Sequence, residues 1–285
     1  MNIIAAELMK DVPREYSTFY NALRELMQDI TLSGLSRTDF FKRAAFQGGT
    51  CLRLLHGLDR YSEDLVFCVT DGKRELDLDS YATTIDREFG SFGINAKVEI
   101  KKNRTNIAGC MVKGNLWELM TVCGLPESKI PAMHHDALIR IKLDIDTETP
   151  PGFRVEHAYR LKPIHYPVAS LDLPSLFAGK MSAVIGRQWH NRFKGRDLYD
   201  FEWYVQKGIP PNMSFLESNL KRACIIDEND TLTECMVKDI LAKRFSEIDY
   251  ESAYLDIRSF VSDGSSISSW DEQYFNGLIS RMVFE

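Results

Sequence analysis

The segment from residue 46 to residue 67, FQGGTCLRLLHGLDRYSEDLVF, constrains the fold of this chain more than any other. A short apolar run ends at Gly48, Gly49 and Thr50, and a segment with helical spacing of leucines follows. This order predicts a strand, a tight turn and a helix whose first backbone N–H groups are free to bind phosphate. Because glycine has no side chain, the turn can approach a phosphate closely. A Gly-Gly-Thr sequence alone is more often a plain strand–helix turn.

A charged loop, RYSED at 60–64, follows this helix and leads into a second strand, DLVFCV. If the second strand neighbours the first, Asp64 lies beside the glycine turn. A carboxylate beside bound phosphate is what a Mg²⁺–nucleotide site requires, because Mg²⁺ bridges carboxylate and phosphate oxygens. The sequence therefore offers Asp64 as a candidate metal ligand.

A third strand is expected at IKLDID, residues 141–146, where apolar and charged residues alternate. On a strand, Lys142, Asp144 and Asp146 share one face. Three charged residues on one face indicate either a solvated edge or a metal-lined cleft. The pattern alone favours the solvated edge.

Residues 171–204 form a helical, basic segment. Lys180 lies mid-helix among apolar neighbours, where a lysine either extends to solvent or neutralises a triphosphate as a point charge. Asp197 and Asp200 stand three residues apart on one face of the next helix, where the simplest interpretation is that they cap it and pair with Arg196.

The loop between these two helices is rich in basic residues. Its basic and imidazole side chains are Arg187, His190, Arg192, Lys194 and Arg196. The whole chain has a net charge of −6, so it carries no global nucleic-acid footprint. Contact with RNA or a triphosphate would depend on a local patch, and this loop is the candidate.

The chain of 285 residues reads as an α/β region followed by helices. A helix is expected over 14–30, strands at 44–47, 64–69, 94–100 and 137–146, and a helix over 77–89. After Pro167 the pattern is helical, and Asp172 is predicted to cap a helix that ends near Gly186. Further helices are expected near 197–206, 213–224, 230–244, 249–262 and 270–282. We expect a helical segment, 1–43, packed on an α/β domain, 44–170, and a helical domain, 171–285.

Composition excludes other protein classes. Apolar residues make up 44% and charged residues 27%, which is ordinary for a globular protein. No apolar run is long enough for a transmembrane helix and the N-terminus does not resemble a signal peptide, so a cytoplasmic protein without membrane partners is expected. The six cysteines are scattered and form no CxxC pair, which predicts reduced, packed thiols.

Three segments in this order resemble the AbiEii/AbiGii toxin family. They are GGTCLRLLHGLDRYSEDLVF at 48–67, IKLDIDTETPPG at 141–152 and DLPSLFAGKMSAVIGRQWHNRFKGRDLYDFEWY at 172–204. Members of this family are nucleotidyltransferases with a polymerase-beta-like fold that act as type IV toxin–antitoxin and abortive-infection toxins. The resemblance implies an α/β nucleotidyltransferase core with a mixed sheet, followed by a C-terminal helical bundle.

The resemblance also implies roles for individual residues. As catalytic residues it implies Asp64, Asp144, Lys180 and Asp197. For nucleotide binding it implies Gly48, Gly49, Thr50, Ser62, Lys180 and Arg196. Asp64, Asp144 and Asp146 would hold Mg²⁺ in a two-metal site, and Arg187, Arg192 and Lys194 are RNA-binding candidates. The implied partners are a nucleoside triphosphate, an RNA acceptor such as transfer RNA, and a cognate antitoxin.

One position departs from the family pattern. The family has Asp-x-Asp on the metal strand, whereas this chain has Asp64, Leu65 and Val66. Residues i and i+2 of a strand point to the same face, so Val66 places an isopropyl group where a carboxylate belongs. Valine cannot ligate Mg²⁺, and a two-metal site would lose a bridging ligand. This predicts an impaired enzyme.

Several interpretations of Val66 stay open. It is either an inactivating change, selected or engineered because an intact toxin harms its host, or the mark of a non-catalytic nucleotide- or RNA-binding relative. Retention of Asp144, Lys180 and Asp197 favours the first. Alternatively, Asp146 supplies the missing oxygen. A third class of protein, a nucleotidyltransferase that modifies a small molecule such as an antibiotic, differs in its acceptor.

Overall fold

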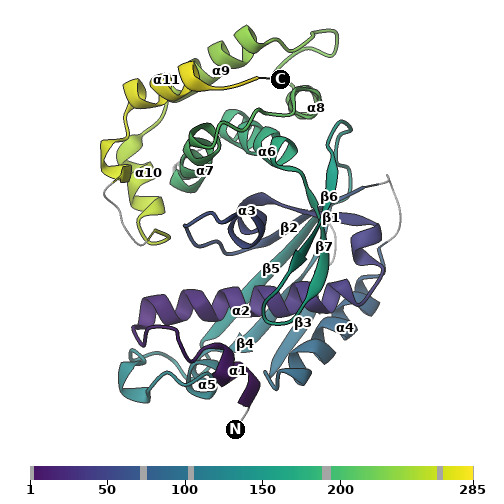
Figure 1. Ribbon diagram of the computed structural model, residues 1–285, viewed down its shortest axis with the longest axis vertical. Coiled ribbons are helices and arrows are strands. Elements are labelled where there is room, and N and C mark those ends of the chain that lie inside the picture. Colours follow the sequence, from purple (N-terminus) through teal and green to yellow (C-terminus); the bar gives the residue numbers. More distant parts are fainter. Residues whose placement is uncertain (1–2, 71–75, 102–105, 188–193, 262–265, 285) are drawn as a thin grey trace. The chain divides into compact units, whose positions relative to one another are not determined.

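The computed structural model describes residues 3–70, 76–101, 106–187, 194–261 and 266–284 (Figure 1). The chain forms two compact units. The first comprises Met1–Leu55, Ser62–Thr149 and His157–Ser170, and the second comprises His56–Tyr61, Pro150–Glu156 and Leu171–Glu285. Among the described residues, no helix combines the length and the hydropathy needed to span a membrane.

A seven-stranded mixed sheet forms most of the first unit, with the strand order β3-β4-β5-β2-β1-β7-β6. Its strands are β1 (Ala44–Gln47), β2 (Leu65–Val69), β3 (Ala96–Ile100), β4 (Ile107–Asn115), β5 (Leu138–Asp146), β6 (Val155–Arg160) and β7 (Tyr166–Leu171). β2 runs antiparallel to β1 and parallel to β5, so it lies between these two strands. The expected α/β class with a mixed sheet is confirmed, and so are the strands predicted at 44–47, 64–69, 94–100 and 137–146.

Three strands were not predicted from the sequence. β4 contains Gly109 and Gly114, which have low strand propensity. β6 is an edge strand, and none of its residues is fully buried. The expectation that the chain becomes helical directly after Pro167 is wrong, because β7 continues to Leu171 and the exposed proline is accommodated near its start.

Two helices of the first unit, α2 and α4, lie side by side (Figure 1). The helices of this unit are α1 (Ile3–Leu8), α2 (Tyr16–Ser36), α3 (Gly48–His56), α4 (Leu78–Ser91) and α5 (Leu116–Val122). α2 is longer than the predicted helix over 14–30, because its C-terminal half is buried between other elements. A Cβ added at Gly34 would lie 3.0 Å from the Ile85 Cα, so glycine permits the close approach of α2 and α4.

The second unit is helical and has an aromatic core. Its helices are α6 (Leu173–Gly186), α7 (Gly195–Gln206), α8 (Met213–Arg222), α9 (Glu234–Ser246), α10 (Tyr250–Ile257) and α11 (Glu272–Arg281). The predicted cap of α6 is confirmed, since the Asp172 carboxylate accepts a hydrogen bond from the Ser175 N–H at 2.9 Å. The helix predicted over 249–262 ends earlier, at Ile257. In the core, Phe177 stacks on Tyr204 with ring centroids 4.5 Å apart.

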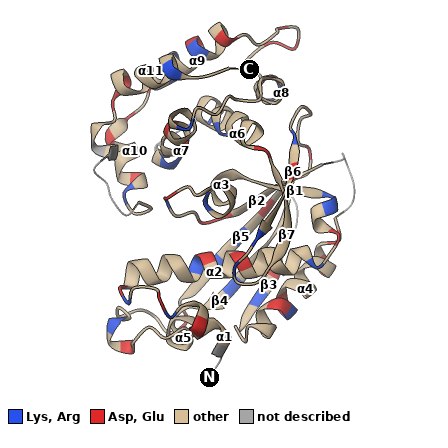
Figure 2. Ribbon diagram, viewed as in Figure 1, with Lys and Arg blue, Asp and Glu red and all other residues tan. Residues whose placement is uncertain are grey.

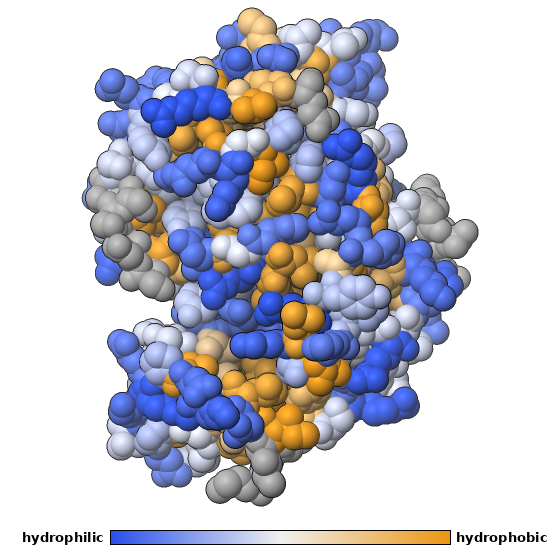
Figure 3. Space-filling view, in the orientation of Figure 1, coloured by the Kyte–Doolittle hydropathy of each residue, from blue (hydrophilic) through white to orange (hydrophobic). Residues whose placement is uncertain are grey.

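Burial of cysteines agrees with the prediction of packed thiols for most of them. None of the six forms a disulfide; Cys51, Cys68, Cys110 and Cys123 are buried, whereas Cys224 and Cys235 are exposed. Hydrophilic residues cover most of the face drawn in Figure 3, with hydrophobic residues in scattered groups between them.

Candidate functional site

The glycine turn lies directly over residue 66. β1 ends at Gln47, and Gly48 takes a positive φ of 81° to begin α3. L-residues with a side chain rarely adopt this conformation, which explains the glycine. A Cβ added at Gly48 would lie 3.5 Å from the Val66 Cβ, so the side chain at position 66 forms the floor of the turn.

The Thr50 hydroxyl holds the loop that carries Ser62 and Asp64. Thr50 is 1% exposed, and its Oγ1 lies 2.8 Å from the Ser62 Oγ and also donates to the main-chain oxygen of Asp64. The side chain of Thr50 therefore faces this loop. If residues 48–50 bind phosphate, as the sequence predicts, the backbone N–H groups at the N-terminus of α3 are the donors.

A glutamine of α2 holds the same loop from another direction. Gln28, 1% exposed, donates its Nε2 to the carbonyl oxygens of Ser62 at 3.0 Å and Glu63 at 2.9 Å. The Glu63 carboxylate pairs with Arg24 at 3.0 Å. These contacts fix the main chain of the loop while Asp64, which follows it, is exposed.

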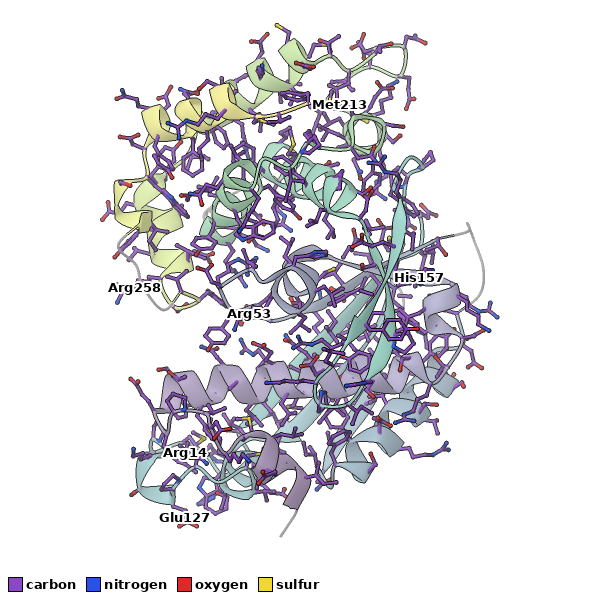
Figure 4. All side chains as sticks on the ribbon, viewed as in Figure 1. Arg14, Arg53, Glu127, His157, Met213 and Arg258 are labelled. Atoms are coloured by element: carbon purple, nitrogen blue, oxygen red, sulfur yellow. The ribbon has the colours of Figure 1, made fainter. Side chains whose placement is uncertain are left out.

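A further contact ties α3 to α2. Arg53 projects from α3, where it is labelled in Figure 4, and its Nε donates to Glu25 at 3.1 Å. The helix that follows the glycine turn is thus held in place by charged side chains along its flank.

Val66 and Asp144 face the same side of the sheet. In the register of the sheet, Val66 pairs with Gln47 on β1 and with Asp144 on β5, and Asp144 pairs with Gly109 on β4. A Cβ added at Gly109 would lie 2.1 Å from the Leu143 carbonyl oxygen, so only glycine fits there. Asp144 consequently stands between the methyl groups of a valine and a residue without a side chain.

The Asp144 carboxylate is paired with a lysine of its own strand, Lys142. Its Nζ forms an ion pair with Oδ2 of Asp144, and both side chains are partly exposed. β5 lies between β4 and β2, so this face does not belong to the solvated edge that the strand pattern alone favours. Lys142 was seen in the sequence as one of three charges on a face, but its pairing with Asp144 was not predicted.

Asp146 lies one row further along the same face. It pairs in register with Cys68 of β2, and its Oδ1 accepts a hydrogen bond from the Glu148 N–H at 3.0 Å. Burial and the charge of Asp146 raise the pKa of Cys68 to about 12. The carboxylate of Asp146 thus shapes the turn that follows β5.

The carboxylates of the first unit offer a limited set of metal ligands. Among the described residues, no three His, Cys, Asp or Glu side chains converge as they would around a metal ion. Mg²⁺ in nucleotide enzymes is often held by one or two carboxylates and completed by phosphate oxygens and water. Asp64 and Asp144 would supply oxygen ligands of that kind, whereas the Val66 side chain, beside Asp144 in the sheet, has no oxygen to offer.

A buried ionic network lies in the second unit. The Lys180 Nζ is 2.7 Å from Oδ1 of Asp197 and 2.7 Å from Oδ2 of Asp200. The side chain of Lys180 is only 11% exposed, so it does not extend to solvent. Asp197 also pairs with Arg187, and α7 thereby presents two carboxylates to cations from α6 and its C-terminal end.

Arg60 joins this network through a bidentate pair. Its Nε and Nη2 each donate to Asp200 at 2.7 Å, and the side chains of Arg60 and Asp200 are 3% and 0% exposed. Burial opposes the charge on Arg60, but Asp200 outweighs it and raises the pKa of the guanidinium. Although burial opposes ionisation of Asp197, the charges of Lys180 and Arg187 lower the pKa of its carboxyl to about 2.

The basic loop is only partly within the described residues. His190 and Arg192 lie outside them. Partial burial and the charges of Arg187 and Arg196 lower the pKa of Lys194. Figure 2 shows Lys and Arg interspersed with Asp and Glu along the helices.

The simplest interpretation of the sequence pairs Arg196 with Asp197 and Asp200, but the structure brings it against Phe260 and Asp256. Its guanidinium lies 4.2 Å from the centroid of the Phe260 ring and its Nε lies 3.6 Å from Asp256. Asp197 and Asp200 pair instead with Lys180, Arg187 and Arg60. Gly195 explains the close approach here, since an added Cβ would lie 1.9 Å from the Ala253 carbonyl oxygen on α10.

The expected residues therefore fall into two sets, one in each unit. Around the glycine turn of the first unit are Gly48, Gly49, Thr50, Ser62, Asp64, Val66, Asp144 and Asp146. In the second unit are Lys180, Arg187, Lys194, Arg196 and Asp197. Sequence reasoning missed Gln28, whose signal was a polar residue on the buried face of α2, and the pairing of Arg60, whose signal was its place two residues before Ser62.

Comparisons with known proteins identify a family for the sequence and relatives of the fold. The family model for the nucleotidyl transferase AbiEii toxin of type IV toxin–antitoxin systems matches residues 30–276. MenT4, a nucleotidyltransferase toxin from Mycobacterium tuberculosis, has a TM-score of 0.57 and 14% identity, covering 99% of this chain and 89% of that one. JHP933 from Helicobacter pylori has a TM-score of 0.52 and 14% identity, covering 91% and 90%. No curated protein matches in sequence. Identities of this size show a shared fold alone.

Proposed function

Because this chain belongs to the AbiEii family of nucleotidyl transferase toxins of type IV toxin–antitoxin systems, we propose that it transfers a nucleoside monophosphate from a nucleoside triphosphate to RNA. Transfer RNA is the first acceptor to test. The observation that supports this most is the glycine turn of α3 over residue 66, with Asp144 opposite on β5. The N-terminus of α3 follows β1 and Asp144 lies on β5, with Val66 of β2 between them. Free N–H groups and a carboxylate in this arrangement suit a nucleotide site.

The proposed reaction is an in-line phosphoryl transfer. The acceptor hydroxyl attacks the α-phosphorus, the bond to the β-phosphate oxygen breaks, and pyrophosphate leaves. Such reactions depend mainly on positioning and on neutralising phosphate charge. We assign the proton of the attacking hydroxyl to Asp144, because it is a partly buried carboxylate beside the turn.

The remaining roles are assigned as follows. The N–H groups at Gly48 and Gly49 bind phosphate, with Ser62 at the mouth of the turn. Mg²⁺, held by Asp64 and Asp144, would supply positive charge to the phosphates. Lys180 binds the triphosphate, Asp197 holds Lys180 and Arg187, and Arg196 completes the nucleotide contacts. Arg187, Arg192 and Lys194 contact the RNA.

Val66 supports a second candidate function. With a valine at the floor of the turn and Lys142 on Asp144, the chain could retain nucleotide or RNA binding without catalysis. A non-catalytic relative of the same fold would bind a nucleoside triphosphate yet transfer nothing.

A transfer assay distinguishes the two functions. The unaltered chain and Val66→Asp are incubated with each labelled nucleoside triphosphate, Mg²⁺ and total transfer RNA, with Val66→Asn as the control of equal shape. Labelling by Val66→Asp alone supports a toxin with an inactivating substitution. Labelling by both chains shows that Val66 is tolerated and makes Asp146 the ligand to test. If neither labels RNA, the proposed transfer to RNA is wrong.

The acceptor is tested separately in whichever chain is active. Neutralising Arg192 and Lys194 together should abolish RNA labelling while nucleotide binding persists. Unchanged RNA labelling would contradict the assignment of the basic loop to RNA. Labelling of small molecules alone would favour an antibiotic-type acceptor.

A further inference from the structure

We infer that Asp200 and Arg60 are positioning residues that hold the Lys180 ammonium in place for the triphosphate. This rests on the proposed function, since it takes Lys180 as a triphosphate ligand. Neither Asp200 nor Arg60 is among the residues that the family resemblance assigns to the site.

Both carboxylate oxygens of Asp200 are bound by cations of the second unit. Asp200 is 0% exposed, and its two oxygens accept from Nε and Nη2 of Arg60 at 2.7 Å each. The same Oδ2 lies 2.7 Å from the Lys180 Nζ. A carboxylate with no access to water and three charged contacts has a fixed orientation, because any rotation breaks charge-assisted hydrogen bonds.

Lys180 needs such a partner. A lysine carries its charge on a flexible four-carbon stem with rotatable donors, so its own geometry does not fix the ammonium. Asp197 alone does not suffice, because it is shared between Lys180 and Arg187. Two carboxylates spaced three residues apart on α7 define one position for the Nζ, and Asp200 is the one that solvent cannot reach.

Arg60 suits its place for a reason that lysine would not satisfy. The planar guanidinium engages both oxygens of Asp200 and uses a third donor, Nη1, for the Tyr61 carbonyl oxygen at 2.9 Å. The Tyr61 N–H in turn donates to the Phe260 carbonyl oxygen at 2.8 Å. The residue that orients Asp200 therefore also fixes the main chain immediately before Ser62.

A purely structural role is the competing explanation. Breaking a buried ion pair at one partner is strongly destabilising, whereas replacing both partners with apolar residues is often neutral. Stability and positioning can therefore be separated. A double apolar replacement removes the charges near Lys180 without leaving an unpaired buried charge.

The experiment measures equilibrium binding of nucleoside triphosphates with Mg²⁺ by calorimetry, together with the unfolding temperature of each full-length variant. The variants are Lys180→Met, Asp200→Asn, Arg60→Lys and the double variant Arg60→Met with Asp200→Leu. Asp29→Asn is the matched control, because Asp29 forms a second bidentate pair, with Arg160 at 2.8 Å and 3.0 Å, in the first unit.

Asp200→Asn should weaken triphosphate binding about tenfold or more, the size expected for losing one charge-assisted hydrogen bond. Arg60→Lys should weaken it less, since the charge remains. The double variant should unfold near the temperature of the unaltered chain, but its affinity for triphosphate should stay as low as that of Asp200→Asn. Asp29→Asn should lower the unfolding temperature while leaving triphosphate affinity unchanged.

Two outcomes overturn different statements. If the double variant binds triphosphate as tightly as the unaltered chain while Lys180→Met does not, the pair is structural and the inference is wrong. If Lys180→Met binds as tightly as the unaltered chain, or if the unaltered chain binds no triphosphate, the proposed function itself fails. The double variant keeps the test decisive even if Asp200→Asn does not fold.

Discussion

Val66 on β2 and Asp144 on β5 stand directly opposite each other on neighbouring parallel strands, with the Gly48 turn over the valine. A carboxylate at position 66 would therefore face that of Asp144 across one strand spacing, about 4.8 Å between backbones. The substitution Val66→Asp would add a second negative charge beneath the turn, next to that of Asp144.

Val66→Asp should make stability depend on divalent metal. Two carboxylates directly opposite each other repel, so the unfolding temperature without metal should fall below that of the unaltered chain. Added Mg²⁺ or Mn²⁺ should raise it again by binding the folded state. Scanning calorimetry with and without metal checks this, and Val66→Asn is the uncharged control. Equal responses of Val66→Asp and Val66→Asn to metal would contradict the expectation.

Lys142→Met should strengthen metal binding at Asp144. The Lys142 ammonium pairs with the carboxylate, and a metal ion must displace it. Removing the competing cation should lower the dissociation constant for Mn²⁺ about tenfold, the size of one charge-assisted contact. Electron paramagnetic resonance titration of free Mn²⁺ measures this. Lys113→Met, which removes a lysine paired with Glu99 on the edge of the sheet, should leave the affinity as it was.

Thr50→Val should lower the free energy of unfolding by about 0.5–1.5 kcal/mol, because it removes the hydroxyl that contacts Ser62 and the main-chain oxygen of Asp64. The affected loop carries Ser62 and Asp64, so nucleotide affinity should fall as well. Urea denaturation and calorimetry provide the two measurements. Thr121→Val is the control, because that hydroxyl bonds only within α5, to the Trp117 carbonyl oxygen. A larger stability loss at Thr121 than at Thr50 would sink this expectation.

Asp197 should make the protein sensitive to acid. Burial opposes its ionisation, yet Lys180 and Arg187 lower the pKa of the folded carboxyl to about 2, below the ordinary value of 3.8. A lowered folded pKa contributes stability that is present above the unfolded pKa and lost as pH falls through the folded one. The free energy of unfolding should therefore fall between about pH 4 and pH 2.

Equilibrium unfolding over that pH range tests this expectation. Asp197→Asn should show a smaller loss of stability between these pH values. Asp29→Asn should change the pH profile in the opposite direction. Burial raises the pKa of the Asp29 carboxyl despite its pair with Arg160, so protonation of Asp29 favours the folded state as pH falls. An identical pH profile for the unaltered chain and Asp197→Asn would contradict the role given to Asp197.

Local patterns in the sequence predicted much of the first unit. The Gly-Gly turn, the strand that contains Val66 and the alternation around Asp144 all depend on neighbours within a few residues. The shared face of Val66 and Asp144 could not be read from either strand, because it depends on the parallel register of β2 and β5.

Contacts distant in sequence were beyond such patterns. Arg60 and Asp200 are 140 residues apart, and nothing in either segment names the other as its partner. Gln28 looks like one polar residue on an apolar helix until the Ser62 and Glu63 carbonyl groups are seen opposite it. The strands β4 and β7 were not predicted for a different reason. Glycine in β4 and proline in β7 weaken the sequence pattern of a strand, although both strands form.

The short segment His56–Tyr61 belongs to the helical unit although it lies between α3 and β2 of the other. A fragment that stopped at residue 170 would keep Arg60 and Leu58, which is 1% exposed, but lose Asp200 and Phe260. Exchanging the helices with those of a relative would likewise require exchanging residues 56–61 and 150–156. The segments of the two units alternate along the chain, so a single recombination event in the gene cannot exchange one unit and leave the other intact.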